Sequence, residues 1–445
     1  HRVCHVIPDY PSSRNRPGAW FEKNMAKHKW QFTARFRTGA YGWQGTALAA
    51  KRIKEAVSEI KKVARSDSAL AGQGAVDLLC RLYPACEHID GSSGSLGTAL
   101  HRTVAALVPI LIQADWDMRT RGRWLGNLYE AVCNDGWSIL SEVEDNWGEI
   151  CVYPELANLW ADRLIPFLRD VWSSESRGHV IGDGACLSCL LYTHRYDELQ
   201  ELVALDRLKF WSNARFWAEA LVQQDKIDEA VAYAESIRDL YEGRYDSRSI
   251  DGFCEKTLLE AGRAEEAYTM YGLRVPGQGT YLSAYRRLVS KYPHRDARQI
   301  LLDLMGKSGE RGKWFAAAKD AGFLDIALAC ARSGQTEPST LLRATRDFAE
   351  KEPQFAVEVG IESIKALLSG TSYELPTGLD IAVHYEAVMA VACKHGMGDH
   401  VKAELARAAC GPFGDQLLRE ALMRKLQQDS APAVSGRGNS DERPV

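Results

Sequence analysis

The sequence predicts an all-α protein. Apolar side chains recur with the spacing of an amphipathic helix at Leu48, Ile53, Val57, Ile60 and Val63, with lysines and glutamates on the opposite face. Similar patterns cover residues 75–83, 96–113, 121–133 and 156–172, and clusters of Gly, Ser, Asn and Asp interrupt them at 90–95, 134–136 and 173–184. No convincing series of alternating strands accompanies these patterns.

Composition indicates a folded protein with reduced thiols. The chain has 445 residues, of which 46% are hydrophobic and 26% charged, and a net charge of -4 that by itself predicts neither a nucleic-acid nor a membrane partner. Eleven cysteines lie scattered in apolar helix-like runs, which favours a cytoplasmic protein. The longest apolar run, 104–112, is shorter than the roughly 18 residues that cross a bilayer. We expect a buried helix there, bent or started near Pro109.

We expect five segments along the chain. Residues 1–24 lack a sustained period and carry three prolines, so we expect a non-native or disordered leader. A basic, aromatic lead-in at 25–47 and an N-terminal helical region at 48–172 follow. Residues 185–426 carry helical repeats. From Asp429 onward there is no aromatic residue, Leu or Ile, and we expect a disordered tail at 427–445.

The repeats in the second half share one pattern. "LLYTHRYDEL", "LVQQDKIDEA", "LLEAGRAEEA" and "AAKDAGFLDIA" each place a turn after an apolar run, then an acidic residue and a small or apolar one. The equivalent positions, 29 to 37 residues apart, are Leu199, Ala230, Ala267, Ala297, Ala327 and Ala356. This period, with two helical segments per unit, predicts stacked helical hairpins. A small residue at the crossing lets neighbouring helices approach to roughly 8 to 10 Å.

In this pattern, clearest in "ALVQQDKIDEAVAYAES" and "LLEAGRAEEAYTMYG", residues 185–360 resemble the tetratricopeptide-like α-solenoids. The Trp, Tyr and closing Pro of the tetratricopeptide consensus are irregular or missing, so the repeats are degenerate. The resemblance implies a superhelix of antiparallel helix pairs whose concave face binds peptides or partner helices. The whole chain is also similar to uncharacterised bacterial helical-repeat proteins, a resemblance that implies no activity. We therefore expect a non-enzymatic scaffold or adaptor for a protein partner.

Two glycine motifs resemble nucleotide-binding loops. "MGKSGERGKW" at 305–314 contains Gly-Lys-Ser, but a phosphate-binding loop requires a further Gly at the position that Leu301 occupies. "GQGTYL" at 277–282 has Leu282 where a dinucleotide fingerprint requires its third Gly. We interpret both as loops between helices and expect no cofactor.

Metal and acid–base chemistry are the other enzymatic hypothesis. Cys186 and Cys189 form a CxxC with His179 and His194 in range, but they lie in an apolar run and no second CxxC exists. We expect buried thiols and no metal. The carboxylates near Trp116 and Trp147 are interpreted as solvated caps: Asp115, Asp117, Glu142, Glu144 and Asp145. Tryptophans are frequent between 116 and 172 and are expected mostly in the core, with an aromatic peptide groove as the alternative.

The stretch "RFRTGAYGWQGTALAAKRIKEAV", residues 35–57, combines glycines, rings and cations. Between Lys27 and Arg65 the sequence has ten Lys or Arg and two Glu, which gives a local charge of +8. In the structural interpretation, Gly39, Gly42 and Gly45 let the chain turn and Thr46 caps a helix. Five rings would then anchor the lead-in against the first helices: Trp30, Phe32, Phe36, Tyr41 and Trp43.

The alternative interpretation of this stretch is an arm that binds nucleic acid or a partner. Phosphate can bind the free N–H groups at a helix start such as 46–48. The candidate binding residues are Arg35, Arg37, Tyr41, Trp43, Lys51 and Arg52. The sequence favours the structural interpretation, since five rings exceed what a short solvated arm requires.

Overall fold

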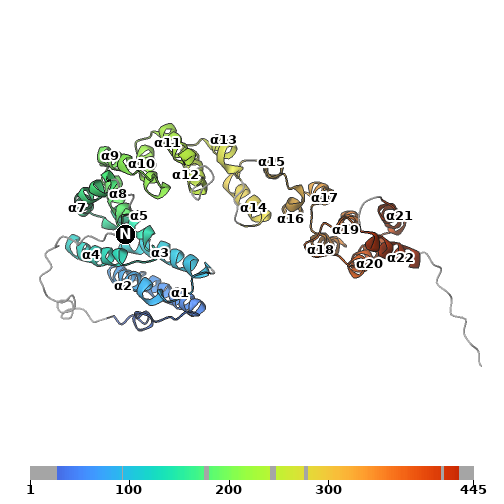
Figure 1. Ribbon diagram of the computed structural model, residues 1–445, viewed down its shortest axis with the longest axis horizontal. Helices are drawn as coiled ribbons and strands as arrows, with labels where there is room; N and C mark the ends of the chain where they lie inside the picture. The colour runs from blue at the N-terminus through green and yellow to red at the C-terminus, as the bar shows by residue number, and fades with distance from the viewer. Residues whose placement is uncertain are drawn as a thin grey trace, which may run out of the picture. The chain divides into compact units, whose positions relative to one another are not determined.

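The all-α class is confirmed. The computed structural model describes residues 28–92, 94–174, 180–240, 247–274, 279–411 and 415–429, and within these ranges it contains 22 α-helices and no strand (Figure 1). The expected leader at 1–24 lies outside the described residues. The expected tail at 427–445 begins too early, because Gln427 and Gln428 still belong to α22, and residues from 430 onward lie outside the described residues. Contacts divide the chain into two units, His1–Thr257 and Leu258–Val445, which are described separately below.

The first unit begins with the helices that the apolar periodicity predicts. They are α1 (Thr46–Val63), α2 (Ser68–Cys86), α3 (Ser95–Gln113), α4 (Met118–Cys133) and α7 (Pro154–Ser173), and α1 packs on both α2 and α3. The periodicity missed α5 (Ser141–Asp145) and α6 (Trp147–Cys151), because a five-residue helix has too few positions to show a period. Carboxylates cap two of the helices: Asp67 accepts the N–H of Leu70 at 2.8 Å, and Asp117 accepts that of Thr120 at 2.7 Å.

Helix α3 is the buried helix expected around residues 104–112, and it is longer than that apolar run. Pro109 lies inside it, so the helix does not start there. Among the described helices it is the one long and apolar enough, by length and composition, to cross a membrane. Its apolar face is buried at Leu100, Val104, Leu107 and Leu111 against the core of the unit. A core helix of this kind passes the same test of length and composition.

The centre of the first unit is α8 (Asp183–Tyr192), which is buried at every residue from 183 to 191. It packs against α5, α6, α7, α9 (Tyr196–Leu205) and α10 (Trp211–Gln223). Trp147 and Trp160, with ring centroids 5.1 Å apart, belong to the same core, as do Trp116 and Trp172. The unit continues through α11 (Ile227–Leu240) into α12 (Ser247–Glu260).

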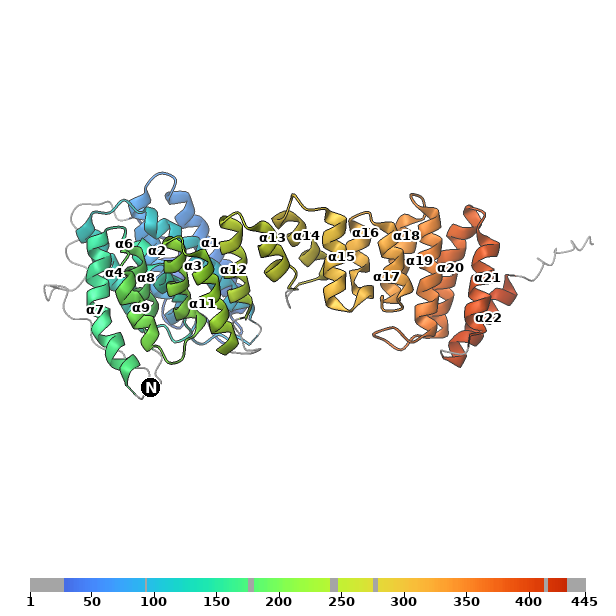
Figure 2. The same cartoon turned by 90° about the horizontal axis from the view of Figure 1, so that it is seen from above.

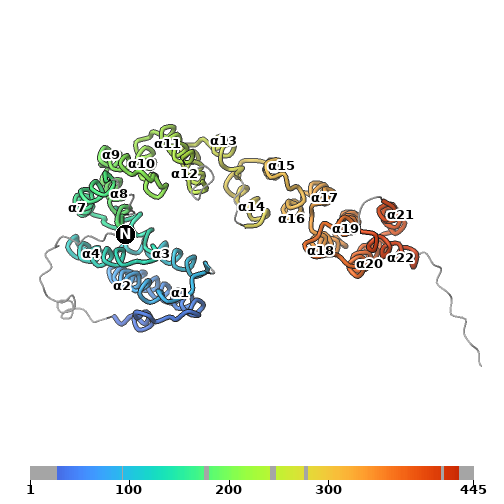
Figure 3. Tube along the Cα trace, in the orientation of Figure 1, coloured from blue at the N-terminus to red at the C-terminus, as the bar shows by residue number. Residues whose placement is uncertain are grey.

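In the second unit, several helices contact the next helix but one in the chain. After α13 (Ala264–Ala267) and a π-helical turn (Tyr268–Gly272), the unit contains α14 (Tyr281–Lys291), α15 (Ala297–Ser308), α16 (Phe315–Asp320), α17 (Leu324–Arg332), α18 (Pro338–Phe348), α19 (Pro353–Leu368), α20 (Gly378–Lys394), α21 (Gly398–Ala409) and α22 (Gln416–Gln428). Helix α14 contacts α16, α20 contacts both α18 and α22, and α19 contacts both α17 and α21. Figure 2 and the trace in Figure 3 show α18 to α22 following one another in chain order.

One three-residue turn recurs between paired helices. Its middle residue has a positive φ at five junctions: His194 (56°), Asp225 (59°), Gly262 (75°), Gly322 (80°) and Gly396 (72°). The N–H of the third turn residue donates to the carbonyl five residues earlier, at 2.7 to 3.0 Å, in Arg195 to Leu190, Lys226 to Leu221, Arg263 to Leu258, Phe323 to Ala318 and Met397 to Ala392. This is the Schellman motif that ends a helix at a left-handed residue.

Where the next helix follows the turn at once, a buried residue comes at a fixed position. The same turn also occurs at Gly370 (φ 75°), where Thr371 donates to the Ala366 carbonyl at 3.1 Å, but no helix follows at once and the equivalent residue, Leu375, is exposed. Four residues after the third turn residue lie Leu199, Ala230, Ala267, Ala327 and Val401, each 0% exposed. The expected equivalence of Leu199, Ala230, Ala267 and Ala327 is therefore confirmed, and Val401 occupies the same position. Ala356, also 0% exposed, follows a different turn. The assignment of Ala297 is wrong, because it is the partly exposed first residue of α15 after the cap Asp296, and Ile300 is the fully buried one.

We predict that Ala267→Trp and Ala327→Trp each lower the free energy of unfolding by about 1 to 3 kcal/mol or more, because an indole cannot fit at a fully buried helix crossing. Urea denaturation followed by circular dichroism measures the effect. Ala403→Trp on an exposed position of α21 is the matched control and is expected to unfold like the parent. Equal stability of all three variants would contradict the packing described for the turn.

Candidate functional site

The aromatic lead-in packs against the first helices at four of its five rings. Trp30, Phe32, Phe36 and Tyr41 are 1 to 7% exposed, and the Trp30 and Phe32 rings lie 5.4 Å apart. A Cβ at Gly74 of α2 would lie 2.4 Å from the Trp30 ring, so α2 must have glycine there to admit the indole. The expectation is wrong for Trp43, whose side chain is 68% exposed.

The glycine loop before α1 is held by the end of α2. The N–H of Gly39 donates to the Pro84 carbonyl at 2.8 Å, and Asp90 donates its N–H to the Trp43 carbonyl at 3.0 Å. Of the loop's three glycines, Gly39 has a positive φ of 65°. The sequence predicted that Thr46 caps α1, and this is wrong. Thr46 is the first helical residue, and its hydroxyl donates to the Asp90 carbonyl at 3.3 Å.

Arg35, Tyr41 and Arg52 are close to one another. Arg35 pairs with Glu55 at 2.6 Å, and the Arg52 guanidinium lies 5.8 Å from the centre of the Tyr41 ring. Burial raises the pKa of the Tyr41 hydroxyl, and the adjacent Arg52 guanidinium opposes that rise. The other candidates, Arg37, Trp43 and Lys51, are exposed.

A row of exposed cations runs along α1. Lys51, Lys54, Ser58, Lys61 and Arg65 follow one another at spacings of three and four residues, so they share one face of the helix and the turn after it. We call Lys51, Lys54, Lys61 and Arg65 the lysine stripe. No described residue forms an ion pair with any of these four, and the stripe contains no acid.

The acidic residues of α1 lie on the neighbouring row and already have partners. Glu55 pairs with Arg35, and Glu59 accepts the backbone N–H of Gln31 at 3.0 Å. The candidate list from the sequence included Lys51 but missed Lys54, Lys61 and Arg65. Their spacing of three and four residues was the signal that could have found them.

The Gly-Lys-Ser motif lies in a loop region, as interpreted from the sequence. Lys307 and Ser308 end α15, and Gly309, with a φ of 67°, terminates it, whereas a phosphate-binding loop places these residues at a helix start. In the second motif, Thr280 caps α14 by accepting the N–H of Ser283 at 3.1 Å. Gly277 and Gln278 lie outside the described residues.

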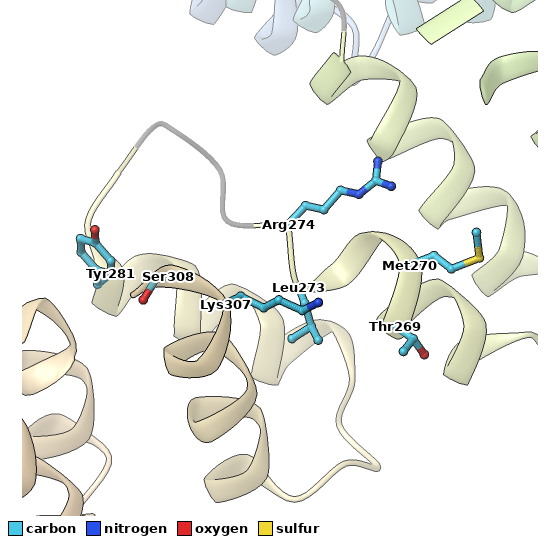
Figure 4. A pocket seen from close by; sticks show the side chains of 7 residues that line it. All are labelled: Thr269, Met270, Leu273, Arg274, Tyr281, Lys307 and Ser308. Atoms are coloured by element: carbon cyan, nitrogen blue, oxygen red, sulfur yellow. The ribbon is translucent and has the colours of Figure 1, made fainter. Parts of the chain in front are cut away.

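A hollow of about 570 Å³ adjoins this region and is shown in Figure 4. Its lining residues come from the π-helical turn, α14 and α15: Thr269, Met270, Leu273, Arg274, Tyr281, Lys307 and Ser308. The Tyr281 hydroxyl donates to Glu310 at 2.5 Å, and Ser308 accepts the indole N–H of Trp314 at 2.6 Å. These two polar groups therefore serve the fold of the second unit.

Glu144 is not the solvated cap expected from the sequence. It accepts the N–H of Gly182 at 3.0 Å, and burial, reinforced by the charge of Asp183, raises its pKa to about 8. Its neighbour Asp145 pairs with Arg215 at 2.7 Å. These contacts join α5 to α8 and α10. Within the described ranges, no three His, Cys, Asp or Glu side chains are grouped so as to hold a metal ion.

The two thiols of the CxxC motif belong to the core. Cys186 and Cys189 are both 0% exposed in α8, and burial raises the pKa of each. His194 belongs to the turn after α8, where its ring accepts or donates a hydrogen bond with the Tyr196 hydroxyl at 2.6 Å. His179 lies outside the described residues.

The exposed groups of the lead-in and α1 suit non-covalent binding. They provide cations along one helix face and one exposed indole at its start. Comparison with known proteins adds no assignment: no protein-family model matches the chain, and no curated protein matches its sequence.

We predict that Trp30→Ala and Phe36→Ala each lower the free energy of unfolding by about 3 kcal/mol or more, because each removes a buried ring. Trp43→Ala is the matched control and is expected to change it by less than about 0.5 kcal/mol, since the indole is exposed. Chemical denaturation measures all three. A Trp30 variant that unfolds like the parent would show that the lead-in does not contribute to the core.

We predict that stability depends on the protonation of Glu144. Because its pKa rises from 4.5 to about 8 on folding, the folded state keeps a proton that the unfolded state loses. The free energy of unfolding therefore falls as pH rises from about 4.5 to about 8, by at most about 1.4 kcal/mol per pH unit. His384, whose pKa burial lowers to about 4, has the opposite effect below pH 6.5. The range from pH 6.5 to 8 excludes the effect of His384.

The measurement compares the parent with Glu144→Gln by urea denaturation at pH 6.5 and pH 8. The amide imitates the protonated carboxyl, so the variant is expected to lose less stability than the parent over this range. Glu229→Gln on the exposed face of α11 is the control and is expected to follow the parent. If Glu144→Gln also follows the parent, Glu144 is ionised in the folded protein.

Proposed function

We propose that the chain is a tetratricopeptide-like α-solenoid and acts as a non-enzymatic scaffold or adaptor for a protein partner. One observation carries the proposal: at five junctions where the next helix follows at once, the same left-handed turn joins two helices and is followed by a fully buried residue. A hairpin of this kind leaves an apolar face that a neighbouring hairpin covers. Stacked hairpins of degenerate repeats are the architecture that the sequence resembles.

The contacts between alternate helices of the second unit support this proposal. In a stack of hairpins, the first helices of successive hairpins contact one another, and so do the second helices. The contacts of α20 with α18 and α22, and of α19 with α17 and α21, follow that rule within the described residues. A curved stack binds a helix or an extended peptide along its concave face.

Exposed apolar side chains in the second unit also favour a protein partner. Tyr373 and Leu375, before α20, are 90% and 94% exposed, and Leu379 and Leu417 are each 72% exposed. The two helices that carry Leu379 and Leu417, α20 and α22, pack together. Exposed apolar groups that gather on one region mark protein-interaction sites. We place the protein in the cytoplasm, since none of its ten described cysteines forms a disulfide with another.

The test begins with affinity capture on the tagged full chain and continues with the recovered partner in purified form. Isothermal titration then compares the parent with a Tyr373→Ser, Leu375→Ser, Leu379→Ser variant. We expect at least a tenfold loss of affinity, because the variant removes apolar contact area. The control is Met118→Ser with Leu240→Ser, two exposed apolar positions of the first unit. A partner that binds both variants as tightly as the parent would contradict the assignment of this region.

A further inference from the structure

We propose that the lysine stripe and Trp43 bind single-stranded nucleic acid without preference for base sequence. This inference goes beyond the scaffold function and uses different residues. It is carried by the exposure of the four cations, by the exposure of Trp43, and by the distribution of charge along the chain.

The charge of the stripe is not neutralised by the protein. Lys51, Lys54, Lys61 and Arg65 are exposed, and no described acid pairs with them. At about 1.5 Å per residue, Lys51 to Lys61 span about 15 Å along α1, and Arg65 follows in the turn after it, which is long enough to follow several phosphates of an extended strand. The two nearest acids of the helix, Glu55 and Glu59, are already held by Arg35 and Gln31. The cations therefore remain available for an anionic chain.

Trp43 adds a surface for base stacking at the start of the same helix. Its backbone is held through the bond from Asp90, while its indole is 68% exposed. Leu48, which is 48% exposed, lies one turn before Lys51 and continues the same face. No side chain caps the first N–H groups of α1, so this end of the helix also favours a negative charge.

The chemistry of these groups favours a single strand over the other polyanions. Lysine ammonium groups act as point charges toward phosphates and do not impose the paired geometry that carboxylates and base edges require. The stripe contains neither Asn nor Gln to read base edges in a duplex groove. An exposed indole next to cations binds unpaired bases, because every base offers a face for stacking. Duplex DNA and acidic protein lack such accessible bases.

The experiment measures the affinity of the full chain for a fluorescent oligothymidylate by anisotropy at 50 and 200 mM NaCl. If the four cations each neutralise one phosphate, affinity falls with salt at a logarithmic slope of about -2.8, at about 0.7 per phosphate. A Lys51→Gln, Lys54→Gln, Lys61→Gln, Arg65→Gln variant is expected to bind at least tenfold more weakly at 50 mM and to lose most of that slope.

The matched control removes the same charge from scattered exposed positions, Lys226→Gln, Lys307→Gln, Arg343→Gln and Lys351→Gln. It is expected to bind like the parent. Trp43→Ala is expected to lose about 5- to 150-fold in affinity through the lost stacking, and Trp43→Phe to recover most of it. Thermal melts of all variants confirm that they fold like the parent.

Three results would overturn the proposal. The first is equal affinity of the stripe variant and its scattered control. The second is tighter binding of a duplex of the same length, with no effect of Trp43→Ala. The third is equal binding of polyglutamate, which would assign the surface to acidic proteins. None of these results concerns the second unit, so the scaffold function is tested separately by the experiment on that unit.

Discussion

The left-handed residue between paired helices is the constraint on which the repeated part of the chain depends. It reverses the chain within three residues while the helix that ends there still has its last carbonyls bonded. Glycine meets the requirement at three of the five junctions, and His194 and Asp225 meet it at the other two. At these five junctions the next helix begins directly after the turn, and the residue four positions further on is buried. The small or apolar residue at that position follows from the turn.

In the first half of the first unit, helices are joined by a buried side chain and not by the repeated turn. Arg121 of α4 is 1% exposed and donates to the carbonyls of Leu111, at the end of α3, and Ile150 in α6, at 2.9 and 2.8 Å. Its guanidinium also lies 5.2 Å from the ring centre of Trp116. A single side chain with five donors thus satisfies carbonyls that a helix end and a short helix leave free. Here irregular contacts replace the repeated turn.

Periodicity in the sequence predicted the long helices, because burial of one face follows the helical repeat wherever the helix has several turns. Periodicity could not predict which rings of the lead-in are buried. Tyr41 and Trp43 are two residues apart, yet Tyr41 is buried and Trp43 is exposed, because their burial depends on how α2 holds the loop. The shift from Ala297 to Ile300 came from a capping residue that moved the helix start. Glu144 was misjudged because its burial depends on Gly182, which is 38 residues away. The lysine stripe, in contrast, was present in the sequence as a spacing.

The two faces of α1 share no residue, and this separates folding from binding. Ala49, Ile53, Ala56 and Ile60 are buried and hold the helix against α2 and α3. The lysine stripe occupies the outer face, where exposed charges contribute little to stability. The rings follow the same division, since four are buried in the core and Trp43 remains outside. Loss of the charges or of the exposed indole therefore leaves the packed face intact, so any effect on binding would come from the outer face itself.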